Sequence, residues 1–368
     1  MSIQKPNERL LYELERMPTL QNQTFETRIQ ALTCSTGKMR LIQDLETGLV
    51  RNSAFAPEKV IYDQNYQNEQ SLSVAFKLHL AEVQNMLLKY ASSGLFCEVG
   101  CGKGFFLEMM QRAGADILGF DPAYEGSNSA ISKTFFDGRE DISADCIVLR
   151  HVLEHIENPF GFIHSIAKSN RGRGLIYIEV PCLDWILTNR TWFDVFYEHV
   201  NYFRIDDFRR MFGNILVKRR GFGGQYLMIL AEISSLRDEI AKDFIQVEFP
   251  NDIMSDIRFP GTDNSGEIAI WGASSKGVIY SLLAERAKRK VGMAIDINPA
   301  KQGRFLPVTG VKVVPPFVAI DKLPEGTEIV VMNPNYKPEI QELTRGKYVL
   351  LDASGGISKS RTQNWTEV

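Results

Sequence analysis

The sequence predicts an α/β protein built on a doubly wound, mostly parallel sheet, followed along the chain by a second and smaller parallel sheet. Two observations carry this prediction. Short apolar runs alternate with helix-compatible stretches between residues 95 and 232, and the same alternation begins again near residue 266. Parallel strands that helices cover on both faces have such runs. Because 368 residues exceed the usual size of one core, we expect three parts, residues 1–70, 71–235 and 236–368.

The elements follow in chain order. Residues 7–17 have apolar side chains at helical spacing and predict a short amphipathic helix, whereas residues 25–55 show no sustained period. Residues 71–91 again have helical spacing and predict a longer helix that leads into the first sheet. The strands expected there are LFCEVG, ADILGF, DCIVLR and GLIYIEV, and an antiparallel pair joined around residues 221–224 closes the sheet.

The second set of elements begins after residues 249–266, which are rich in Pro, Gly, Asp, Asn and Ser and predict a connection between domains. The strands expected beyond it lie within EIAIWGASSKG, VGMAIDINP, TEIVVMNP and KYVLLDAS. Helix-compatible spacers separate most of them, so a second parallel sheet is predicted.

Composition excludes several classes of protein. The formal net charge is −3, so the chain lacks the excess of basic residues that is typical of nucleic-acid-binding proteins. No apolar stretch approaches the eighteen or so residues of a membrane span, and the N-terminal residues do not resemble a signal peptide. The five cysteines include no CxxC pair, which favours reduced, buried thiols. We therefore expect a cytoplasmic protein that binds neither nucleic acid nor membrane.

The sharpest motif is the glycine-rich turn that starts at Glu98 and contains Gly100, Gly102 and Gly104. It follows a predicted strand and precedes a predicted helix, and about twenty residues later the next strand ends in Asp121. Glycines let the backbone approach a ligand, and an acidic side chain at this spacing accepts hydrogen bonds from ribose hydroxyls. Glu98 suits a cationic ligand and would repel a pyrophosphate. A tight turn without a ligand is the alternative.

In combination, the glycine motif, the GFD segment at residues 119–121 and DCIVLRHVLEHIENP at residues 145–159 resemble the class I S-adenosylmethionine-dependent methyltransferases over about residues 90–235. The resemblance implies a doubly wound sheet with an antiparallel last strand and S-adenosylmethionine as cofactor. It also assigns Glu98 and the three glycines to the methionine end of the cofactor, Asp121 to the ribose and Asp137 to the adenine. Asp137 could equally be a turn residue that caps the following segment.

Three further segments, FYEHVNYF at 196–203, GASSKG at 272–277 and DINPAKQGRFLP at 296–307, resemble the C-methyltransferase family of deoxysugar biosynthesis over nearly the whole chain. That family has a zinc-binding N-terminal domain, a methyltransferase domain and a C-terminal Rossmann-like domain. Here Asp44 and Thr47 stand where zinc cysteines are expected, and Cys34 cannot supply four ligands by itself. The resemblance therefore implies a degenerate N-terminal domain without a metal.

Carbon methylation next to a ketone needs a base and a group that holds the resulting enolate. The Tyr-x-Glu-His motif of the family becomes Phe196-Tyr197-Glu198-His199 here, so its tyrosine position is occupied by phenylalanine. The resemblance implies His199 as the base, His155 as a second residue of the cleft, and Glu198 as a residue that orients a neighbour. Tyr197 or Tyr202 would replace the missing tyrosine. Taken without the resemblance, each histidine is more often structural, and Glu198 could be a buried anchor.

Three segments are further candidates for ligand contacts. The stretch from Tyr62 to His79 resembles the lid of the family over cofactor and acceptor, with Tyr66 as the preferred contact, Tyr62 as the alternate, and Ser71 within the same stretch. The turn GASSKG precedes a helix, so its amides and Lys276 favour an anion such as a nucleotide-sugar diphosphate. A structural turn is the equal alternative, as it is for Asn333 and Tyr336, which lie in the segment NPNYKPEI.

The function expected from these residues is C-methylation of a keto-sugar nucleotide or a related small molecule, with His199 as the base. An O- or N-methyltransferase acting on another small molecule or on a polysaccharide precursor is the enzymatic alternative. A non-catalytic assembly protein that binds S-adenosylmethionine belongs to a different class, and Glu98 argues against a nicotinamide-dependent oxidoreductase. The acceptor and the oligomeric state stay open.

Overall fold

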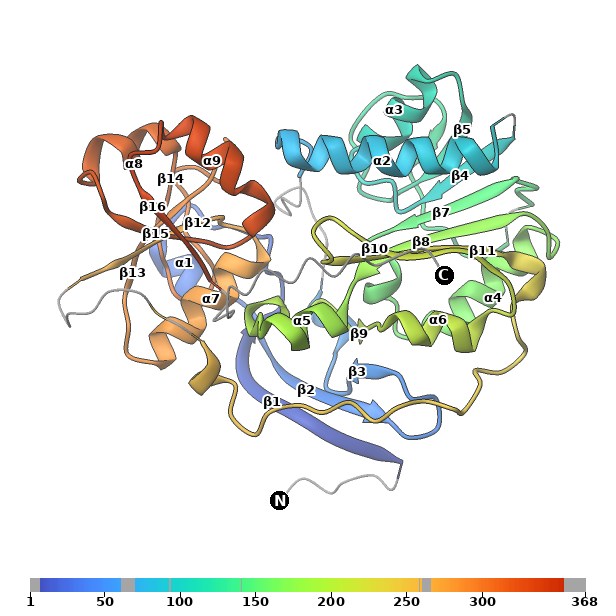
Figure 1. Cartoon of the computed structure of the whole chain (residues 1–368), viewed down its shortest axis with the longest axis horizontal. Coiled ribbons are helices and arrows are strands. Elements are labelled where there is room, and N and C mark those ends of the chain that lie inside the picture. Colours follow the sequence, from blue (N-terminus) through green and yellow to red (C-terminus); the bar gives the residue numbers. More distant parts are fainter. Residues whose placement is uncertain are drawn as a thin grey trace.

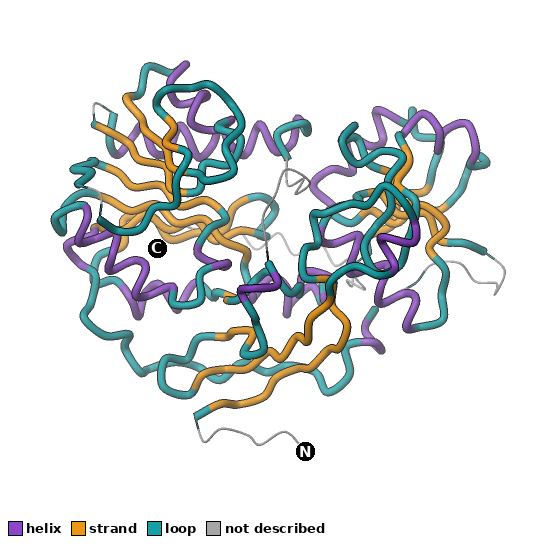
Figure 2. Tube along the Cα trace, turned by 180° about the vertical axis from the view of Figure 1, so that it is seen from behind, coloured by secondary structure: helices purple, strands orange, loops and turns teal. Residues whose placement is uncertain are grey.

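A computed structural model describes residues 7–60, 70–92, 94–139, 141–257, 259 and 266–353 of the chain. The described strands form three sheets of four, seven and five strands. In Figure 1 the seven-stranded sheet lies to the right, the five-stranded sheet to the left, and the four-stranded sheet below and between them. Figure 2 shows the same arrangement from behind. The chain therefore has two α/β layered parts, with a curved sheet spanning underneath.

The N-terminal sheet corrects one prediction. Residues 8–18 form strand β1 (Glu8–Pro18) and not the helix predicted for residues 7–17. β1 pairs antiparallel with β2 (Thr36–Asp44), and β3 (Val50–Asn52) and β9 (Asn201–Tyr202) complete the order β1-β2-β3-β9. Buried Glu8 forms an ion pair with Arg40 of β2 at 2.8 Å. Tertiary pairing overrides the helical spacing of the apolar side chains, because propensity is a weak local preference.

Residues 25–55, which showed no period, contain a short helix and the tight connection of this sheet. Helix α1 (Arg28–Leu32) begins with a capping box between Thr27 and Gln30. Between β2 and β3 the Asp44 carboxylate accepts hydrogen bonds from the backbone N–H groups of Glu46 and Thr47, each at 2.9 Å. Asp44 and Thr47, the residues at the expected zinc positions, thus form a hydrogen-bonded turn.

The seven-stranded sheet has the predicted doubly wound architecture. The strands stand in the order β10-β11-β8-β7-β4-β5-β6. Strands β4 to β8 are parallel to one another, and β11 is antiparallel to both β8 and β10. The bounds are β4 Leu95–Val99, β5 Asp116–Phe120, β6 Ile131–Ser132, β7 Cys146–Arg150, β8 Leu175–Pro181, β10 Ile215–Gly221 and β11 Tyr226–Glu232. The predicted fold class and its closing antiparallel pair are confirmed.

Helices cover both faces of this sheet, as Figure 1 shows. On one face lie α2 (Val74–Tyr90) and α3 (Phe105–Arg112). On the other lie α4 (Pro159–Ser169), α5 (Leu183–Asn189) and α6 (Ile205–Met211). Each face has its own apolar cluster, with Leu80 of α2 in one and Ile166 of α4 in the other. Burial on both faces explains why the sequences of these strands are continuous apolar runs.

The C-terminal part is a smaller, fully parallel sheet in the order β14-β13-β12-β15-β16. Its strands are β12 Ile268–Trp271, β13 Val291–Ile295, β14 Val313–Val314, β15 Glu328–Val331 and β16 Val349–Asp352. The helices are α7 (Ser275–Arg286), α8 (Pro316–Lys322) and α9 (Lys337–Leu343). The four predicted strands are present, and β14, only two residues long, is an addition.

Short 3₁₀ helices complete the described elements. Their bounds are η1 Pro57–Lys59, η2 Leu153–His155, η3 Trp192–Asp194, η4 Ile233–Ser235, η5 Met254–Asp256 and η6 Pro334–Tyr336. η2 places the first histidine segment directly after β7, and η6 follows β15 of the smaller sheet. Both therefore lie at the carboxyl ends of parallel strands, where open α/β sheets bind their ligands.

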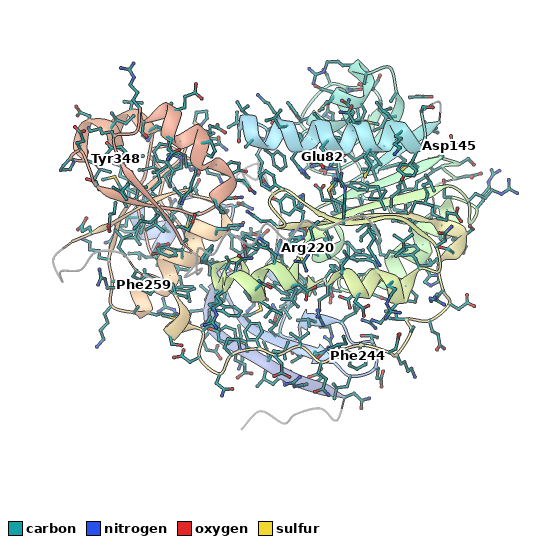
Figure 3. The ribbon with its side chains drawn as sticks, in the orientation of Figure 1. Glu82, Asp145, Arg220, Phe244, Phe259 and Tyr348 are labelled. Carbon is teal, nitrogen blue, oxygen red and sulfur yellow. The ribbon has the colours of Figure 1, made fainter. Side chains whose placement is uncertain are left out.

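The connection between the two α/β parts runs back across the N-terminal sheet (Figure 1). Its backbone is held there by Gln43 of β2, which donates to the Ile245 carbonyl at 3.1 Å and accepts from the Val247 N–H at 2.9 Å. The Phe244 ring of the same segment, labelled in Figure 3, lies under the guanidinium of Arg210 at 5.7 Å. Within the described part of the chain, no helix combines the length and the apolar character that crossing a bilayer requires.

Candidate active site

The glycine-rich turn forms a cavity of about 390 Å³ at the carboxyl ends of β4 and β5. We call it the glycine-loop cavity. Gly100, Gly102 and Gly104 all have positive φ angles, of 74°, 57° and 78°. A Cβ atom at Gly100 would collide with Val152, whereas one at Gly102 would meet nothing within 4 Å, so the loop leaves open space at Gly102. Such conformations strongly favour glycine, which explains the motif.

Four of the predicted cofactor residues, Glu98, Gly100, Gly102 and Asp121, line this cavity together. The Asp121 carboxylate accepts hydrogen bonds from the Gly102 N–H at 2.7 Å and the Ala123 N–H at 2.8 Å, which fixes its position at the cavity wall. Gly104 is the residue that precedes helix α3 and does not line the cavity. Glu98, Gly100, Gly102 and Asp121 therefore share one cavity, whereas Gly104 belongs to the turn that precedes α3.

Asp137, the residue predicted to neighbour the adenine, lies away from the glycine-loop cavity. Asp137 is exposed, is absent from the cavity lining and accepts a hydrogen bond from the Arg139 N–H at 3.0 Å, which matches the turn interpretation. Tyr66 and its alternate Tyr62 lie outside the described residues. Ser71 of the same predicted lid lines the glycine-loop cavity. His79 lies behind it, where its Nε2 atom contacts the Glu179 carboxylate at 2.9 Å.

The electrostatics of the glycine-loop cavity centre on Glu98 and Arg150. Glu98 is 2% exposed, and burial raises the pKa of its carboxyl to about 7, against the opposing effect of Arg150 at 3.8 Å. Arg150 lies over the Phe106 ring at 4.7 Å and contacts the Glu179 carboxylate at 3.4 Å. The cavity thus presents one carboxylate and one buried guanidinium side by side.

A second cavity, of about 260 Å³, lies between the seven-stranded and five-stranded sheets. We call it the interdomain cavity. Its lining comes from all three parts of the chain: Asn22 from the N-terminal part, His155 and His199 from the middle part, and Lys276 and Asp296 from the C-terminal part. Gln70, His151 and His155 line both cavities. The two cavities therefore meet at the histidines of the segment that follows β7.

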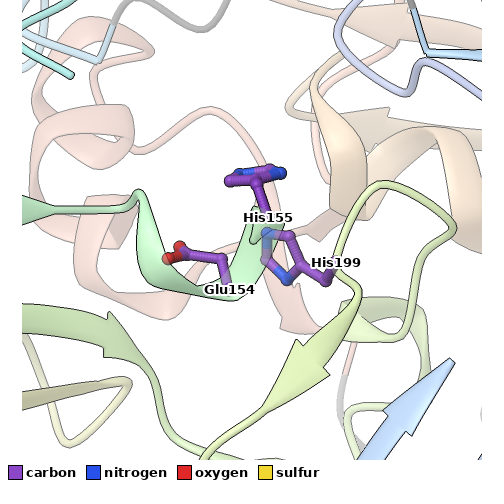
Figure 4. Close-up of side chains that lie close together, drawn as sticks. All are labelled: Glu154, His155 and His199. Atoms are coloured by element: carbon purple, nitrogen blue, oxygen red, sulfur yellow. The ribbon is translucent and has the colours of Figure 1, made fainter. Parts of the chain in front are cut away.

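His155 and His199 lie together at this junction, with ring centroids 5.0 Å apart (Figure 4). The Nδ1 atom of His155 is 3.0 Å from the backbone carbonyl of Glu198. A carbonyl only accepts, so Nδ1 carries the proton and the neutral ring has its lone pair on Nε2. Burial, and then the nearby His155 and His151, hold the pKa of His199 well below its usual range. Neutral His199 is therefore the form present near neutral pH.

The predicted partners of His199 serve other contacts. The Glu198 carboxylate accepts a hydrogen bond from the backbone N–H of Gln21 at 2.6 Å, so it holds the N-terminal segment against this motif. Glu198 orients His155 through its backbone carbonyl. The Tyr197 hydroxyl accepts from the Ala56 N–H at 2.9 Å, and the Tyr202 hydroxyl contacts the Phe196 backbone. Neither tyrosine lines the glycine-loop cavity or the interdomain cavity, whereas the Phe196 ring lies 4.0 Å from the His199 ring, centroid to centroid, and lines the interdomain cavity.

His151 is a site residue that the sequence analysis did not single out. It has a left-handed φ of 54°, an uncommon conformation for a residue with a side chain. Burial lowers its pKa, but Glu154 and Glu179, each 3.3 Å from a ring nitrogen, outweigh burial and raise the pKa of His151 to about 9. A protonated ring therefore lies where the two cavities meet. The signal for it was present in the HVLEH segment.

Arg150 and Glu179 were also missed. They are the two charged residues at the carboxyl ends of β7 and β8, and they face each other in register. Glu179 is fully buried, and although burial alone would raise the pKa of its carboxyl, Arg150, His151 and His79 hold that pKa well below the usual range. A charged residue at the end of an otherwise apolar strand was the available signal.

The C-terminal wall of the interdomain cavity contains the predicted GASSKG turn. Gly272 has φ 117°, and Lys276 lies 3.0 Å from the buried carboxylate of Asp194 and donates to Gln225 at 2.7 Å. Lys301 is 1% exposed and donates to the Ser274 hydroxyl, and burial lowers the pKa of its ammonium group. Asn333 and Tyr336 line the same cavity. Two lysines and a strand-to-helix turn thus face one space.

One cluster among the described residues has the side chains for a metal ion, namely Glu154, His155 and His199. Their potential ligand atoms all lie within 4.8 Å of one another (Figure 4). Three N and O donors suit a divalent transition metal in an open site. In the structure, however, Glu154 Oε1 also contacts His151 Nδ1 at 3.3 Å. The same side chains could therefore act as acid–base groups or as ligands.

Comparison with known proteins finds two family models along the chain. Residues 72–215 match a methyltransferase domain, and residues 260–350 match a C-methyltransferase C-terminal domain. The C-methyltransferase NovU of Streptomyces niveus is 24% identical over 290 residues, which cover 67% of this chain and 68% of that protein.

The comparison with solved structures finds similarity over part of the chain. The 1,6-didemethyltoxoflavin-N1-methyltransferase of Burkholderia thailandensis is 14% identical and covers 43% of this chain and 78% of its own, with a TM-score of 0.33. The magnesium protoporphyrin IX methyltransferase of Synechocystis is 16% identical and covers 43% of this chain and 84% of its own, with a TM-score of 0.35.

Proposed function

We propose that this chain, a class I S-adenosylmethionine-dependent methyltransferase, methylates a carbon atom next to the ketone of a nucleotide-linked sugar, with His199 as the base. The matches to a methyltransferase domain and to a C-methyltransferase C-terminal domain support methyl transfer. The similarity to NovU and the three motifs in residues 196–307 support carbon as the methylated atom. The observation that carries the proposal is the junction of two cavities at His151 and His155.

The junction brings two reactants together. The glycine-loop cavity has the carboxylates Glu98 and Asp121 for the cofactor, and the interdomain cavity offers space for the acceptor. S-adenosylmethionine, when bound, supplies an electrophilic methyl group. Holding both reactants in adjoining cavities makes the transfer effectively unimolecular, which is the largest contribution expected in such a displacement.

His199 is suited to remove the proton. It lines the interdomain cavity, is 7% exposed, and its depressed pKa keeps it neutral near pH 7. In the proposed reaction a lone pair of His199 takes the proton from the carbon next to the ketone, and the electrons of that C–H bond form the enolate. The enolate carbon attacks the methyl group, the carbon–sulfur bond breaks, and its electrons stay on sulfur as a neutral thioether. His199 then releases its proton to solvent.

A positive charge beside the enolate oxygen would lower the barrier. His151 is the protonated ring at the junction, because Glu154 and Glu179 raise its pKa to about 9 despite burial. We place the acceptor oxygen on its side of the interdomain cavity. The diphosphate of the acceptor is proposed to lie at the GASSKG turn, where Lys276 and Lys301 line the cavity.

The test combines binding with proton exchange. We expect S-adenosylhomocysteine to raise the unfolding temperature, and a nucleotide-linked keto-sugar to raise it further. In D₂O with S-adenosylhomocysteine present, the protein should exchange the proton next to the ketone for deuterium, and His199→Gln should stop that exchange. Methylation without any exchange would favour an O- or N-methyltransferase. Binding of neither ligand would contradict the proposal.

A further inference from the structure

Arg150 and Glu98 form an ion pair inside the glycine-loop cavity. We infer that Arg150 binds the α-carboxylate of the cofactor's methionine portion, beside Glu98, which binds the α-ammonium group. The inference rests on the cofactor site of the proposed function and is independent of the acceptor. It assigns one partner to each charge of the amino-acid zwitterion.

Arg150 is placed for this contact by the sheet. It is the last residue of β7, the strand next to β4, which carries Glu98, and both side chains line the glycine-loop cavity. The guanidinium lies 3.8 Å from the Glu98 carboxylate, and the two side chains are 10% and 2% exposed. An α-amino acid presents its ammonium and carboxylate groups one carbon apart. A carboxylate and a guanidinium side by side in the protein are complementary to that pair of charges.

Both side chains keep an atom for a ligand. Among the described residues, Arg150 Nε and Glu98 Oε2 are buried and have no hydrogen-bond partner. A buried donor or acceptor without a partner costs free energy, and a ligand that supplies the partner recovers it. An ammonium group would satisfy the Glu98 oxygen, and a carboxylate would satisfy the Arg150 donor. The unpaired atoms therefore point to the same zwitterion as the charges.

Arg150 is also a preorganised cation of this cavity, in addition to His151 at its junction with the interdomain cavity. Of the described residues that line it, only Lys103 and Arg150 carry lysine or arginine charges, and Lys103 is exposed. The Arg150 guanidinium stacks over Phe106 at 4.7 Å and contacts the fully buried Glu179 at 3.4 Å. Glu179 acts here as a positioning residue, since it touches Arg150 and not the cavity. A planar guanidinium held from two sides suits a carboxylate better than a mobile ammonium group does.

The experiment uses the full chain and three ligands in calorimetric titration at pH 8.5. The ligands are S-adenosylhomocysteine, its decarboxylated analogue, which keeps the amine, and 5′-methylthioadenosine, which lacks the whole amino-acid portion. For the wild-type chain we expect S-adenosylhomocysteine to bind about 10- to 100-fold more tightly than the decarboxylated analogue, the size of a charge-assisted contact. In Arg150→Met that ratio should fall to about 1, and in Arg150→Lys to an intermediate value.

The controls separate this role from a structural one. Arg219→Met removes an arginine that pairs with Glu82 at 2.7 Å on the protein surface, and it should leave the ratio unchanged. The affinity of Arg150→Met for 5′-methylthioadenosine should stay within about threefold of wild type, which also shows that the variant is folded. The inference would be overturned if Arg150→Met lost affinity equally for all three ligands. It would also be overturned if the variant kept the wild-type ratio of affinities for S-adenosylhomocysteine and its decarboxylated analogue. A wild-type chain that binds none of the three would contradict the cofactor site itself.

Discussion

The ring of His155 donates from Nδ1 to the backbone carbonyl of Glu198 over 3.0 Å. This bond joins the segment after β7 to the motif that precedes β9, and it brings His155 and His199 to the junction of the two cavities. It also selects one tautomer of His155, because a carbonyl cannot donate. Glu198, which the family resemblance implied as a residue that orients a neighbour, contacts His155 through its backbone carbonyl.

Replacing His199 should stop methyl transfer and leave cofactor binding intact. His199 lines the interdomain cavity and not the glycine-loop cavity. Loss of a general base lowers the rate by about 10²- to 10⁴-fold. We expect that loss in kcat for His199→Ala, with the dissociation constant for S-adenosylhomocysteine unchanged in titration. Retained turnover would remove His199 from the role of base.

Tyr197→Phe should change stability and not turnover. The Tyr197 hydroxyl is bonded to the Ala56 N–H at 2.9 Å and does not reach either cavity lining. Removing it should lower the free energy of unfolding by about 1 kcal/mol, the usual contribution of such a bond. Urea unfolding and steady-state kinetics of the variant test this. A fall in kcat of tenfold or more at unchanged stability would show that Tyr197 takes part in catalysis.

Binding of S-adenosylmethionine should weaken as pH falls through 7. Burial raises the pKa of Glu98 to about 7, so the ionised carboxylate that attracts the cationic cofactor is present only above that pH. Below it, the affinity should decrease by up to about tenfold per pH unit, and binding should release a proton. Titrations between pH 5.5 and 8.5 in buffers of different ionisation enthalpy measure both quantities. Glu98→Gln should bind weakly with a flat profile, and a flat wild-type profile would contradict the assignment.

Removal of divalent cations should leave methyl transfer unchanged. The cluster of Glu154, His155 and His199 is the one place in the described chain with ligands for a metal. If His199 is the base, its lone pair is not available to an ion, so extensive dialysis against EDTA should not alter kcat. Zinc or manganese that restored activity lost on chelation would instead make His155 and His199 ligands. Elemental analysis of the purified protein distinguishes the two cases.

Part of the site could be predicted because its residues lie close together in the sequence. The turn from Glu98 to Gly104 joins a strand to the helix that follows it, so its glycines and the carboxylate at its start belong to one short segment. The spacing to Asp121 follows from one β–α–β unit, whose geometry is the same in many proteins. The parallel strands of both α/β sheets could be predicted as well, since burial on two faces requires continuous apolar runs.

Contacts between segments that are distant in the sequence could not be predicted. Residues 8–18 have apolar spacing suited to a helix, but β2, eighteen or more residues later, pairs with them as a strand. Arg150 and Glu179 meet only because β7 and β8 pair in that register. Asp137, by contrast, is a local turn residue, and its spacing alone could not distinguish this from a place beside a ligand.

By itself, the sequence determined the two parallel α/β sheets, the glycine-rich loop and the identity of the histidines, because each depends on residues close together in the chain. The tertiary structure alone decided which side chains share a space. It turned Tyr197 and Tyr202 toward backbone groups, brought His151, His155 and His199 to one junction, and buried Arg150 beside Glu98. The physical reason is that burial and the local field depend on segments that meet only after folding, and these set both the pKa values and the free hydrogen-bonding atoms.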